Sequence, residues 1–298
     1  MSEETSTAIG RRYGLERVCR VLEFPRSTIY AKRAAESCKV IALHPQRRGP
    51  APKLSDASLL DAIRADLVAS PFVGEGHRKP WARLRLAGIR VSRTRVCRLM
   101  RENQLLSPHR RPQGKRDPHD GSITTEQPDQ MWGTDGVRIQ TVDDGWVWTF
   151  SAVDHCHAEC VGWHVAKVGD RFAALEPISQ GLLRHFGGVQ AQAGRGLALR
   201  MDHGTQYMSD HFLNQVKFWG IAPSFAFVAQ PQTNGVAERF NRTVKEQAIH
   251  GRVFRNIEEV RRAVAEFVDR YNAHWRLEKL GFRTPQEARQ AHALKQAA

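Results

Sequence analysis

Long hydrophobic runs are missing from this sequence. No window approaches the ~18 consecutive apolar residues that predict a membrane-spanning helix. The first five residues, Met-Ser-Glu-Glu-Thr, are polar and acidic, whereas a signal peptide has a basic segment followed by an apolar one. We therefore expect a cytoplasmic protein without a membrane partner.

Cysteines are few and show no pairing pattern. The five are scattered and odd in number, which argues against a disulfide framework and for a reducing compartment. One segment, His155-Cys-His-Ala-Glu-Cys160, offers four potential zinc ligands at a place where two strands are expected to meet. Alternate residues of a strand point to opposite faces, and no second Cys/His pair has zinc-finger spacing. The pattern therefore argues against a structural zinc site. The five cysteines are Cys19, Cys38, Cys97, Cys156 and Cys160.

Acidic residues are scarce in the first part of the chain. The protein has 45 Lys and Arg against 31 Asp and Glu, a formal net charge of +14. Residues 1–128 hold 25 of the basic and 13 of the acidic residues, which leaves 20 and 18 for residues 129–298. The first part thus carries +12 and the rest +2. A basic front favours contact with nucleic-acid phosphates, although a solvated basic surface without a ligand remains an alternative.

The basic part does contain helical periodicity, in two modules. Residues 14–35 follow a helix, turn, helix pattern, so we predict a helix-turn-helix-like region over 1–43; an ordinary helical hairpin fits the pattern equally well. A linker rich in Pro and Arg, 44–55, separates it from a second helical DNA-binding module, 56–105. A basic Pro-rich linker over 106–123 follows.

The second module ends in a helix with a basic strip. Ser92 is a candidate N-cap for a helix over 93–102. On that helix Arg95, Arg98 and Arg101 recur every three residues, and we expect them to face outward and contact DNA. A solvated structural face is the alternative. The core of the module is expected to contain Leu59, Leu60, Ile63, Leu67, Trp81, Leu84 and Leu86.

From residue 124 the periodicity changes to that of strands. Three successive strands are predicted at 132–140, 146–154 and 160–167. Helices and strands then alternate, with helices at 170–186, 209–219 and 256–275 and strands at 197–201 and 224–228. This order predicts an α/β domain over 124–298, and several α/β topologies remain open at this point.

Residues 234–247 carry much of the candidate chemistry. Val236, Phe240 and Val244 recur at i, i+4 and i+8, which predicts a helix with one buried side. Asn234, directly before a glycine, is a candidate N-cap. The polar side of this helix is expected to carry Glu238, Asn241, Arg242 and Lys245.

Two further acids lie on predicted strands. Asp135 lies within the strand 132–140, and Asp202 ends the strand 197–201 in a glycine turn, 35 residues before Glu238. If these strands are neighbours and the helix packs across them, the three carboxylates meet. A carboxylate cluster without a neutralising base suits hard, oxygen-seeking ions such as Mg²⁺ or Mn²⁺.

The ordered set Asp135, Asp202 and Glu238, with Lys245 seven residues later, resembles the DDE signature of transposases and retroviral integrases. The segments Asp202-His-Gly-Thr-Gln-Tyr207 and Tyr271-Asn272, with Thr-Pro at 284–285, resemble more narrowly the second-frame (OrfB) transposase of the insertion sequence 3 family. The resemblance covers about residues 13–289. It implies an α/β RNase H-like (integrase) catalytic core preceded by all-α helix-turn-helix-like DNA-binding regions.

The resemblance also implies an activity. A DDE transposase of a bacterial insertion sequence binds the element ends and catalyses metal-dependent DNA strand cleavage and strand transfer. Asp135 would contact both of two Mg²⁺ ions, with Mn²⁺ as a possible substitute, while Asp202 would hold one ion and Glu238 the other. Lys245 and Arg242 would contact DNA.

Several partners follow from the same resemblance. These are double-stranded DNA of the terminal inverted repeats and the target, further copies of the chain on DNA, and an upstream-frame (OrfA) product or fusion; the location would be the nucleoid. A noncatalytic DNA-binding regulator derived from a transposase is the main alternative. A nuclease that cleaves without joining is another.

Overall fold

The structure is a computed structural model that describes residues 3–37, 53–108, 125–226 and 234–297. It divides into two compact units, residues 1–53 and 54–298. Most of the two expected linkers therefore lies outside the described residues. No described helix combines the length and the apolar character needed to cross a membrane.

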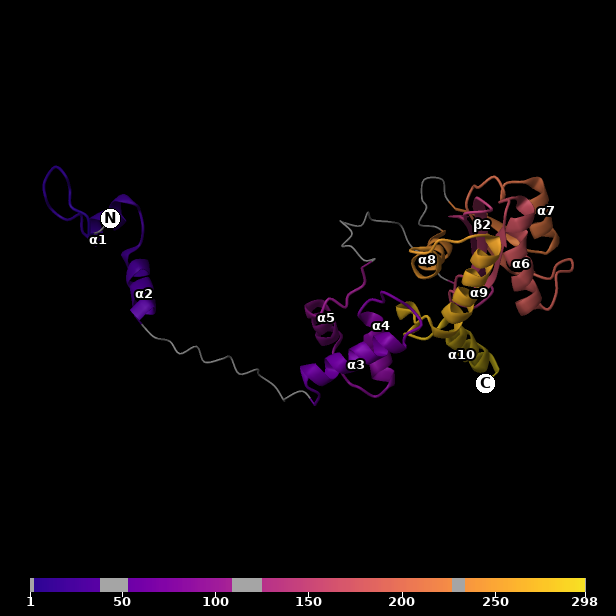
Figure 1. Cartoon of the computed structure of the whole chain (residues 1–298), viewed down its shortest axis with the longest axis horizontal. Helices are drawn as coiled ribbons and strands as arrows, with labels where there is room; N and C mark the ends of the chain where they lie inside the picture. The colour runs from indigo at the N-terminus through magenta and orange to yellow at the C-terminus, as the bar shows by residue number, and fades with distance from the viewer. Residues whose placement is uncertain (1–2, 38–52, 109–124, 227–233, 298) are drawn as a thin grey trace. The chain divides into compact units, whose positions relative to one another are not determined.

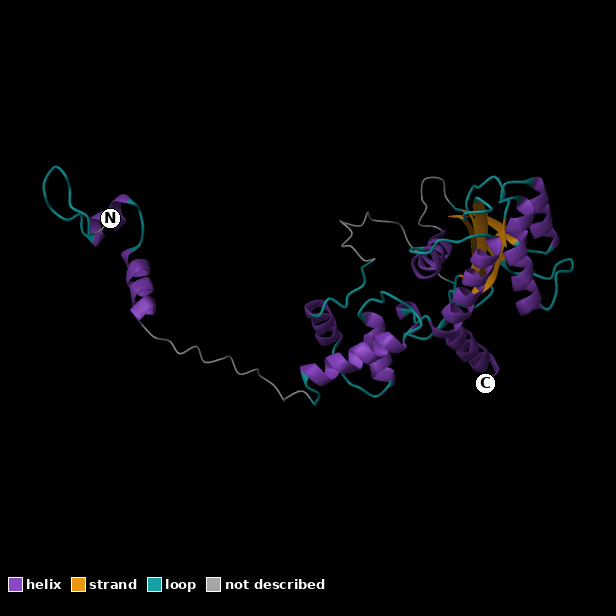
Figure 2. Ribbon diagram, viewed as in Figure 1, coloured by secondary structure: helices purple, strands orange, loops and turns teal. Residues whose placement is uncertain are grey.

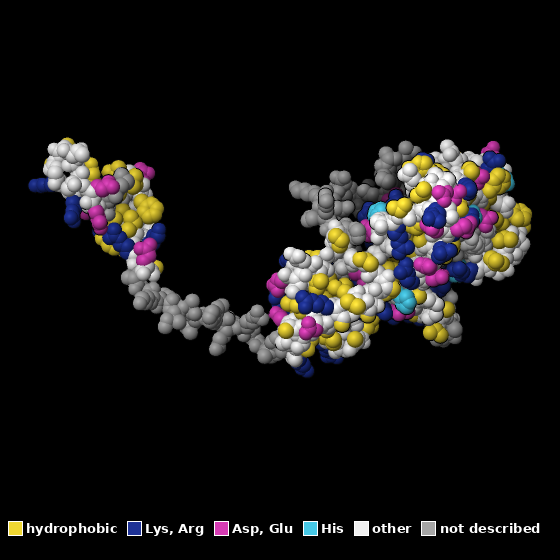
Figure 3. All heavy atoms as spheres, viewed as in Figure 1, with side chains coloured by type: hydrophobic (Ala, Val, Ile, Leu, Met, Phe, Trp, Pro, Cys, Tyr) yellow, Lys and Arg dark blue, Asp and Glu magenta, His cyan; other side chains and the backbone are white. Residues whose placement is uncertain are grey.

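The first unit contains two helices, α1 (Leu15–Val21) and α2 (Arg26–Ser37). They are joined through the predicted turn at Phe24-Pro25, which confirms the helix, turn, helix order. Among the apolar residues of α1 and its C-cap, Cys19 is buried, whereas Leu22 is 59% exposed. Phe24 and Tyr30 are exposed as well, and Figure 3 shows hydrophobic side chains gathered on the visible face of this unit.

The second unit begins with three helices, α3 (Asp56–Ala69), α4 (Arg78–Leu86) and α5 (Arg93–Glu102). Side-chain oxygens of Ser55 and Ser92 accept hydrogen bonds from backbone amides three residues later and cap α3 and α5. Leu86 is 67% exposed, so its predicted core position is wrong. It follows the buried Leu84 by two residues, which places it on the opposite side of the helix. The buried core consists of Leu59, Ile63, Leu84, Val96, Leu99 and Met100.

The remainder of the second unit is built on a five-stranded sheet in the order β3-β2-β1-β4-β5. β1 pairs antiparallel with β2 and parallel with β4. The predicted RNase H-like α/β fold is confirmed. The strands β1 to β5 span Met131–Gln140, Trp146–Asp154, Cys160–Ala166, Ala198–Met201 and Ala222–Phe225.

The position predicted for the fifth strand is shifted. Its residues pair with β4 from Ala198↔Ala222 to Met201↔Phe225, so the strand begins two residues before the prediction. The predicted end, 227–228, lies outside the described residues. The ends of so short a strand depend on its neighbour, which the local sequence does not encode.

Helices cover both faces of the sheet (Figures 1 and 2). On one face, α6 (Arg171–Phe186) and α7 (Asp210–Phe218) pack with Trp132 and Phe150. On the other, α8 (Gly235–Val244) and α9 (Ile257–His274) pack with Val137 and Val147. The chain then forms the 3-10 helix η3 (Glu278–Leu280) and α10 (Pro285–Ala297).

The C-terminal helices are tied to the strands. The Asn272 side chain accepts from the Cys160 backbone N–H and donates to the Cys160 carbonyl, both at 3.0 Å. From α10, Arg289 pairs with Asp129 at 2.7 Å and also with Glu159. Tyr271 is buried, so the Tyr271-Asn272 segment closes the core on this side of the sheet.

Candidate active site

Asp135 lies in the middle of β1, opposite Ser151 of β2. Its Oδ1 accepts a hydrogen bond from the Gly136 amide at 2.8 Å, and its Oδ2 accepts one from Asn241 Nδ2 at 2.9 Å. Burial raises the pKa of the Asp135 carboxyl, and the bond from Asn241 opposes that rise because it favours the ionised form. Asp135 is thus partly desolvated and fixed in orientation.

Asp202 directly follows β4, the parallel neighbour of β1. The register places Gly133 beside Arg200, so two residues further along both strands lead to Asp135 and Asp202. Asp202 is exposed, and its Oδ1 accepts from the Gly204 amide at 2.9 Å in the predicted glycine turn. The neighbouring strands that the sequence analysis required are therefore present.

Glu238 lies in the first turn of α8 and is exposed. Burial raises the pKa of its carboxyl, and the negative charges of Asp135 and Asp202 raise the pKa further. The charge of Asp202 also raises the pKa of Asp135. The three predicted acids therefore lie within electrostatic reach of one another, on two strands and one helix.

The ligand atoms of the three acids do not form one tight group. Within the described part of the chain, Asp154, Cys156 and His157 form the group whose ligand atoms all lie within 4.8 Å of one another. The three acids of the candidate active site do not meet that spacing as a group of three.

Asn241 was not predicted as a functional residue. It is buried on α8, three residues after Glu238, and it connects β1 and β2 because its Oδ1 accepts from Ser151 Oγ at 3.1 Å while its Nδ2 donates to Asp135. Its place on the same helix face as Glu238 was a signal in the sequence. The hydrogen bonds to Asp135 and Ser151 explain why the polar side chain of Asn241 is buried at this position.

Asn234 does not cap α8 as predicted. Its side chain makes no capping hydrogen bond, and Nδ2 instead donates to the Thr134 carbonyl at 3.0 Å. The same bond joins the start of α8 to β1, next to Asp135. The predicted apolar side of α8 is confirmed, since Phe240 and Val244 are buried and Val236 packs against them.

Two basic residues, one on α8 and one just after it, lie close enough to the acids to lower their pKa values. The charge of Arg242 lowers the pKa of Glu238, and that of Lys245 lowers the pKa of Asp135. Lys245 begins a π-helical turn, Lys245–Ile249, and is exposed. In the same turn, Gln247 exchanges two hydrogen bonds with the Val73 backbone, at 3.0 and 2.8 Å.

The basic strip of α5 does not face outward as a whole. Arg95 donates to Asp56 Oδ1 and to the Leu54 carbonyl, both at 2.7 Å, and Arg98 donates to Asp56 Oδ2 at 2.6 Å. The prediction of an outward position is therefore wrong for Arg95, whose side chain is 20% exposed, whereas the Arg98 side chain is 41% exposed and is paired at the surface with Asp56 and Glu102. Arg101 is exposed as predicted.

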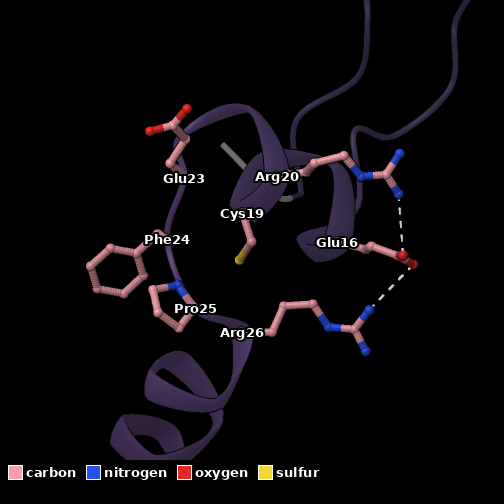
Figure 4. Close-up of a pocket in the computed structure, with 7 residues that line it drawn as sticks. All are labelled: Glu16, Cys19, Arg20, Glu23, Phe24, Pro25 and Arg26. Atoms are coloured by element: carbon pink, nitrogen blue, oxygen red, sulfur yellow. Dashed lines mark hydrogen bonds and ion pairs between the residues drawn. The ribbon is translucent and has the colours of Figure 1, made fainter.

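The first unit carries a second basic cluster. Arg20 of α1 and Arg26 of α2 flank the Glu16 carboxylate at 3.3 and 3.4 Å, across the turn that contains Phe24-Pro25 (Figure 4). These pairs are largely exposed, so they contribute little stability.

Comparisons with known proteins identify the same regions. Residues 125–231 match an integrase core domain family, residues 219–285 a second family of the same description, and residues 57–113 an HTH-like domain. The transposase for insertion sequence element IS629 of Shigella sonnei is 28% identical over 294 residues, which cover 94% of this chain and 93% of that protein. The transposase InsD for insertion element IS2A/D/F/H/I/K of Escherichia coli is 27% identical over 220 residues, which cover 71% and 72%.

Among solved structures, the crystal structure of the catalytic core domain of BIV integrase aligns with a TM-score of 0.42 at 19% identity, covering 57% of this chain and 99% of that chain. The family matches place an HTH-like domain over α3 to α5 and an integrase core over the sheet. The chain therefore contains an integrase core domain and an HTH-like domain, and it is similar over most of its length to transposases of insertion sequences.

Proposed function

We propose that Asp135, Asp202 and Glu238 are the catalytic carboxylates of a DDE transposase that cleaves and joins DNA strands. The observation that carries the proposal is geometric: Asp135 of β1 and Asp202 at the end of β4 lie on neighbouring parallel strands, and Asn234 and Asn241 join the helix of Glu238 to β1 beside Asp135. A protein that gathers like charges in a partly desolvated place fits a cationic ligand, because the ligand offsets their repulsion.

Mg²⁺ is the ion that this set of ligands fits best, with Mn²⁺ as a substitute, because all three side chains offer hard oxygen ligands. Bound divalent ions activate an attacking oxygen and stabilise the leaving oxygen in displacement at phosphorus. We assign Asp135 to both of two ions, Asp202 to one and Glu238 to the other.

Other side chains of the site prepare it for DNA. The hydrogen bond from Asn241 favours the ionised form of Asp135 and fixes the orientation of its carboxylate. Lys245 and Arg242 are exposed next to the acids, and their charges suit contacts with phosphates.

The proposed reaction has two steps. In the first, water attacks the phosphodiester at the element end, the bond from phosphorus to the 3′ oxygen breaks, and a 3′-hydroxyl is released. In the second, that hydroxyl attacks the phosphorus of another phosphodiester, the bond from that phosphorus to its 3′ oxygen breaks, and a new 3′-hydroxyl leaves as the strands are joined. The resemblance to the insertion sequence 3 family assigns the other end of the same element as the first target.

DNA binding is assigned to the basic front of the chain. Residues 1–128 carry a net charge of +12 and include the HTH-like domain. We propose residues 1–43 and 56–105 as two DNA-binding regions, with linkers at 44–55 and 106–123 and the catalytic core at 124–298. Oligomerisation on DNA and joining to an upstream-frame product belong to the same proposal.

The test is a cleavage and strand-transfer assay on an element-end duplex. Asp135→Asn, Asp202→Asn and Glu238→Gln should each lower the Mg²⁺-dependent rate by at least about 10³-fold, since each removes a ligand charge. Glu246→Gln is the matched control, because Glu246 lies in the turn directly after α8 and is not assigned to the site. DNA binding in a gel shift should persist in all four variants.

Cleavage that survives all three active-site changes would refute the assignment. Binding of ends by the wild-type chain, without cleavage under any metal condition, would support the noncatalytic regulator instead.

A further inference from the structure

A second group of potential metal ligands lies at the end of β2, outside the candidate active site. The ligand atoms of Asp154, Cys156 and His157 all lie within 4.8 Å of one another. β2 ends at Asp154 and β3 begins at Cys160, so residues 155–159 belong to neither strand. The alternation of strand side chains, which argued against zinc in the sequence analysis, therefore does not apply to this segment.

The distances among these side chains are close to those of a zinc site. Cys156 Sγ lies 3.7 Å from His157 Nε2, and Asp154 Oδ1 lies 4.0 Å from His157 Nδ1. Ligand atoms around one tetrahedral Zn²⁺ lie about 3.5 Å apart, given metal–ligand bonds of roughly 2.0–2.3 Å. One imidazole binds an ion through a single nitrogen, so with Nδ1 of His157 as the ligand the Asp154 separation would have to shorten by about 0.5 Å, and Cys156 Sγ would have to turn from Nε2 toward Nδ1.

His157 contributes a buried ring nitrogen that, in the part of the chain that the structure describes, lacks a hydrogen-bond partner. Its side chain is 6% exposed, and within the described residues its Nδ1 has no hydrogen-bond partner. Buried polar atoms without a partner are uncommon in folded proteins, and bound ions are one explanation for them. Metal binding would satisfy this ring.

The candidate fourth ligand is His292 of the C-terminal helix, which lies outside the 4.8 Å group and would have to move toward it. The ring centroids of His157 and His292 of α10 lie 5.7 Å apart. Two imidazoles on one tetrahedral Zn²⁺ place their centroids roughly 5 Å apart. Gln296 Nε2 lies 3.0 Å from His292 Nε2, and this contact leaves Nδ1 of the same ring for a ligand role.

The surroundings support a cation at this place. The Asp154 carboxylate is buried and is oriented by the backbone amides of His157 and Asp129, both at 2.8 Å. Such supporting bonds are typical of the shell around metal ligands. Two cations lie nearby: Arg289 is paired with Asp129 and Glu159, and Lys279 donates to the His155 carbonyl at 3.0 Å, so the Asp154 carboxylate and a Cys156 thiolate would have to offset the charge of Lys279 as well as that of zinc.

We propose that Asp154, Cys156, His157 and His292 form a zinc site that fastens α10 to the turn after β2. The thiolate and imidazole ligands favour Zn²⁺ over Mg²⁺, in contrast to the all-oxygen set of the active site. The two sites are separate, because Asp154 follows Ser151, the partner of Asp135, by three residues, or about 10 Å along a strand. The proposal does not depend on the proposed function.

A zinc site in the turn after β2 would also restrict movement next to the candidate active site. An added Cβ at Gly133 of β1 would lie 2.9 Å from His155 Nε2 and 3.1 Å from Asn234 Oδ1. The turn after β2 thus packs against β1 at the point where Asn234 joins the start of α8. Fixing this turn would limit movement of the helix that carries Glu238.

The test uses the full-length chain, stripped with a chelator and reloaded with Zn²⁺ or Co²⁺. The Asp202→Asn, Glu238→Gln background removes ligands of the active site, so metal analysis should find one equivalent of zinc there. The Co²⁺ form should show a thiolate-to-metal charge-transfer band, which carboxylates cannot produce. At about 100 times Kd, zinc should raise Tm by roughly 5–10 °C.

Cys156→Ser and His292→Ala should lose the tightly bound zinc, and Cys156→Ser should lose the charge-transfer band. Cys97→Ser is the matched control, because Cys97 is a free cysteine on α5 in the HTH-like domain, and it should keep both. A wild-type Co²⁺ spectrum without the thiolate band overturns the proposal, whether or not the variants fold. Unchanged zinc content in Cys156→Ser overturns it as well.

Discussion

The hydrogen bond from Asn241 to Asp135 offers a quantitative test of the site. Asn241→Leu keeps a similar side-chain size but removes the 2.9 Å bond to Asp135 Oδ2. Because that bond favours the ionised carboxylate, its loss raises the pKa of Asp135 further above its usual range. Divalent ions bind the ionised form, so metal binding should require a higher pH in the variant.

The size of the effect follows from the strength of such a bond. A hydrogen bond to a charged group contributes ~1.5–3 kcal/mol, and about 1.4 kcal/mol corresponds to a tenfold change in affinity. We expect Mg²⁺ or Mn²⁺ affinity to fall roughly 10- to 100-fold where Asp135 is partly protonated, and to recover as the pH rises. Titration calorimetry at several pH values measures this directly.

The matched control is Thr243→Val. Thr243 is also buried on α8, and it donates a 2.9 Å hydrogen bond to the Arg239 carbonyl, away from Asp135. A general loosening of α8 would affect both variants alike. If both shift the pH dependence of metal binding equally, or if Asn241→Leu shifts nothing, the reasoning about Asp135 is refuted.

Three further predictions concern DNA binding, packing and pH. Arg101→Ala should weaken binding to element ends and reduce the salt dependence by about one ion contact, because Arg101 is exposed. Arg95→Ala should mainly lower Tm, because Arg95 is hydrogen-bonded within the module. Gel-shift titrations measure the first effect and calorimetry the second, and equal effects of both variants in both assays would contradict the distinction. Gly162→Ala should prevent stable folding, because an added Cβ would lie 1.9 Å from the Pro177 carbonyl oxygen of α6. A variant that unfolds cooperatively, with a free energy of unfolding within ~1 kcal/mol of the wild type, would be incompatible with that contact. Since the pKa of Glu238 is raised, the DNA cleavage rate at limiting Mg²⁺ should fall on acidification before the fold is lost, and more Mg²⁺ should restore the rate. A pH–rate profile that does not depend on the metal concentration would argue against Glu238 as a ligand.

The order of the elements was predictable because it depends on local patterns. The strands at β1, β2 and β3 and the helix α8 follow from alternation and from helical spacing, which neighbouring residues encode. The buried Phe240 and Val244 are one example. The short strand β5 is the contrary case, since its ends depend on pairing with β4.

The candidate acids could also be selected from the sequence, but their surroundings could not. Asp135 and Asn241 are 106 residues apart, and Arg95 and Asp56 are 39 apart, and no periodicity connects either pair. The same applies to His157 and His292, which meet only because α10 returns to the end of β2.

The sequence by itself therefore determined the α/β class, the basic front and the ordered acids, because these depend on residue type and spacing along the chain. The tertiary structure alone decided which arginines are neutralised by Asp56, that Asn241 orients Asp135, and that Cys156 and His157 lie beside a helix from the far end of the chain. Hydrogen bonds and metal coordination act over a few ångströms in space, so they depend on distances that folding creates and that sequence separation does not reveal.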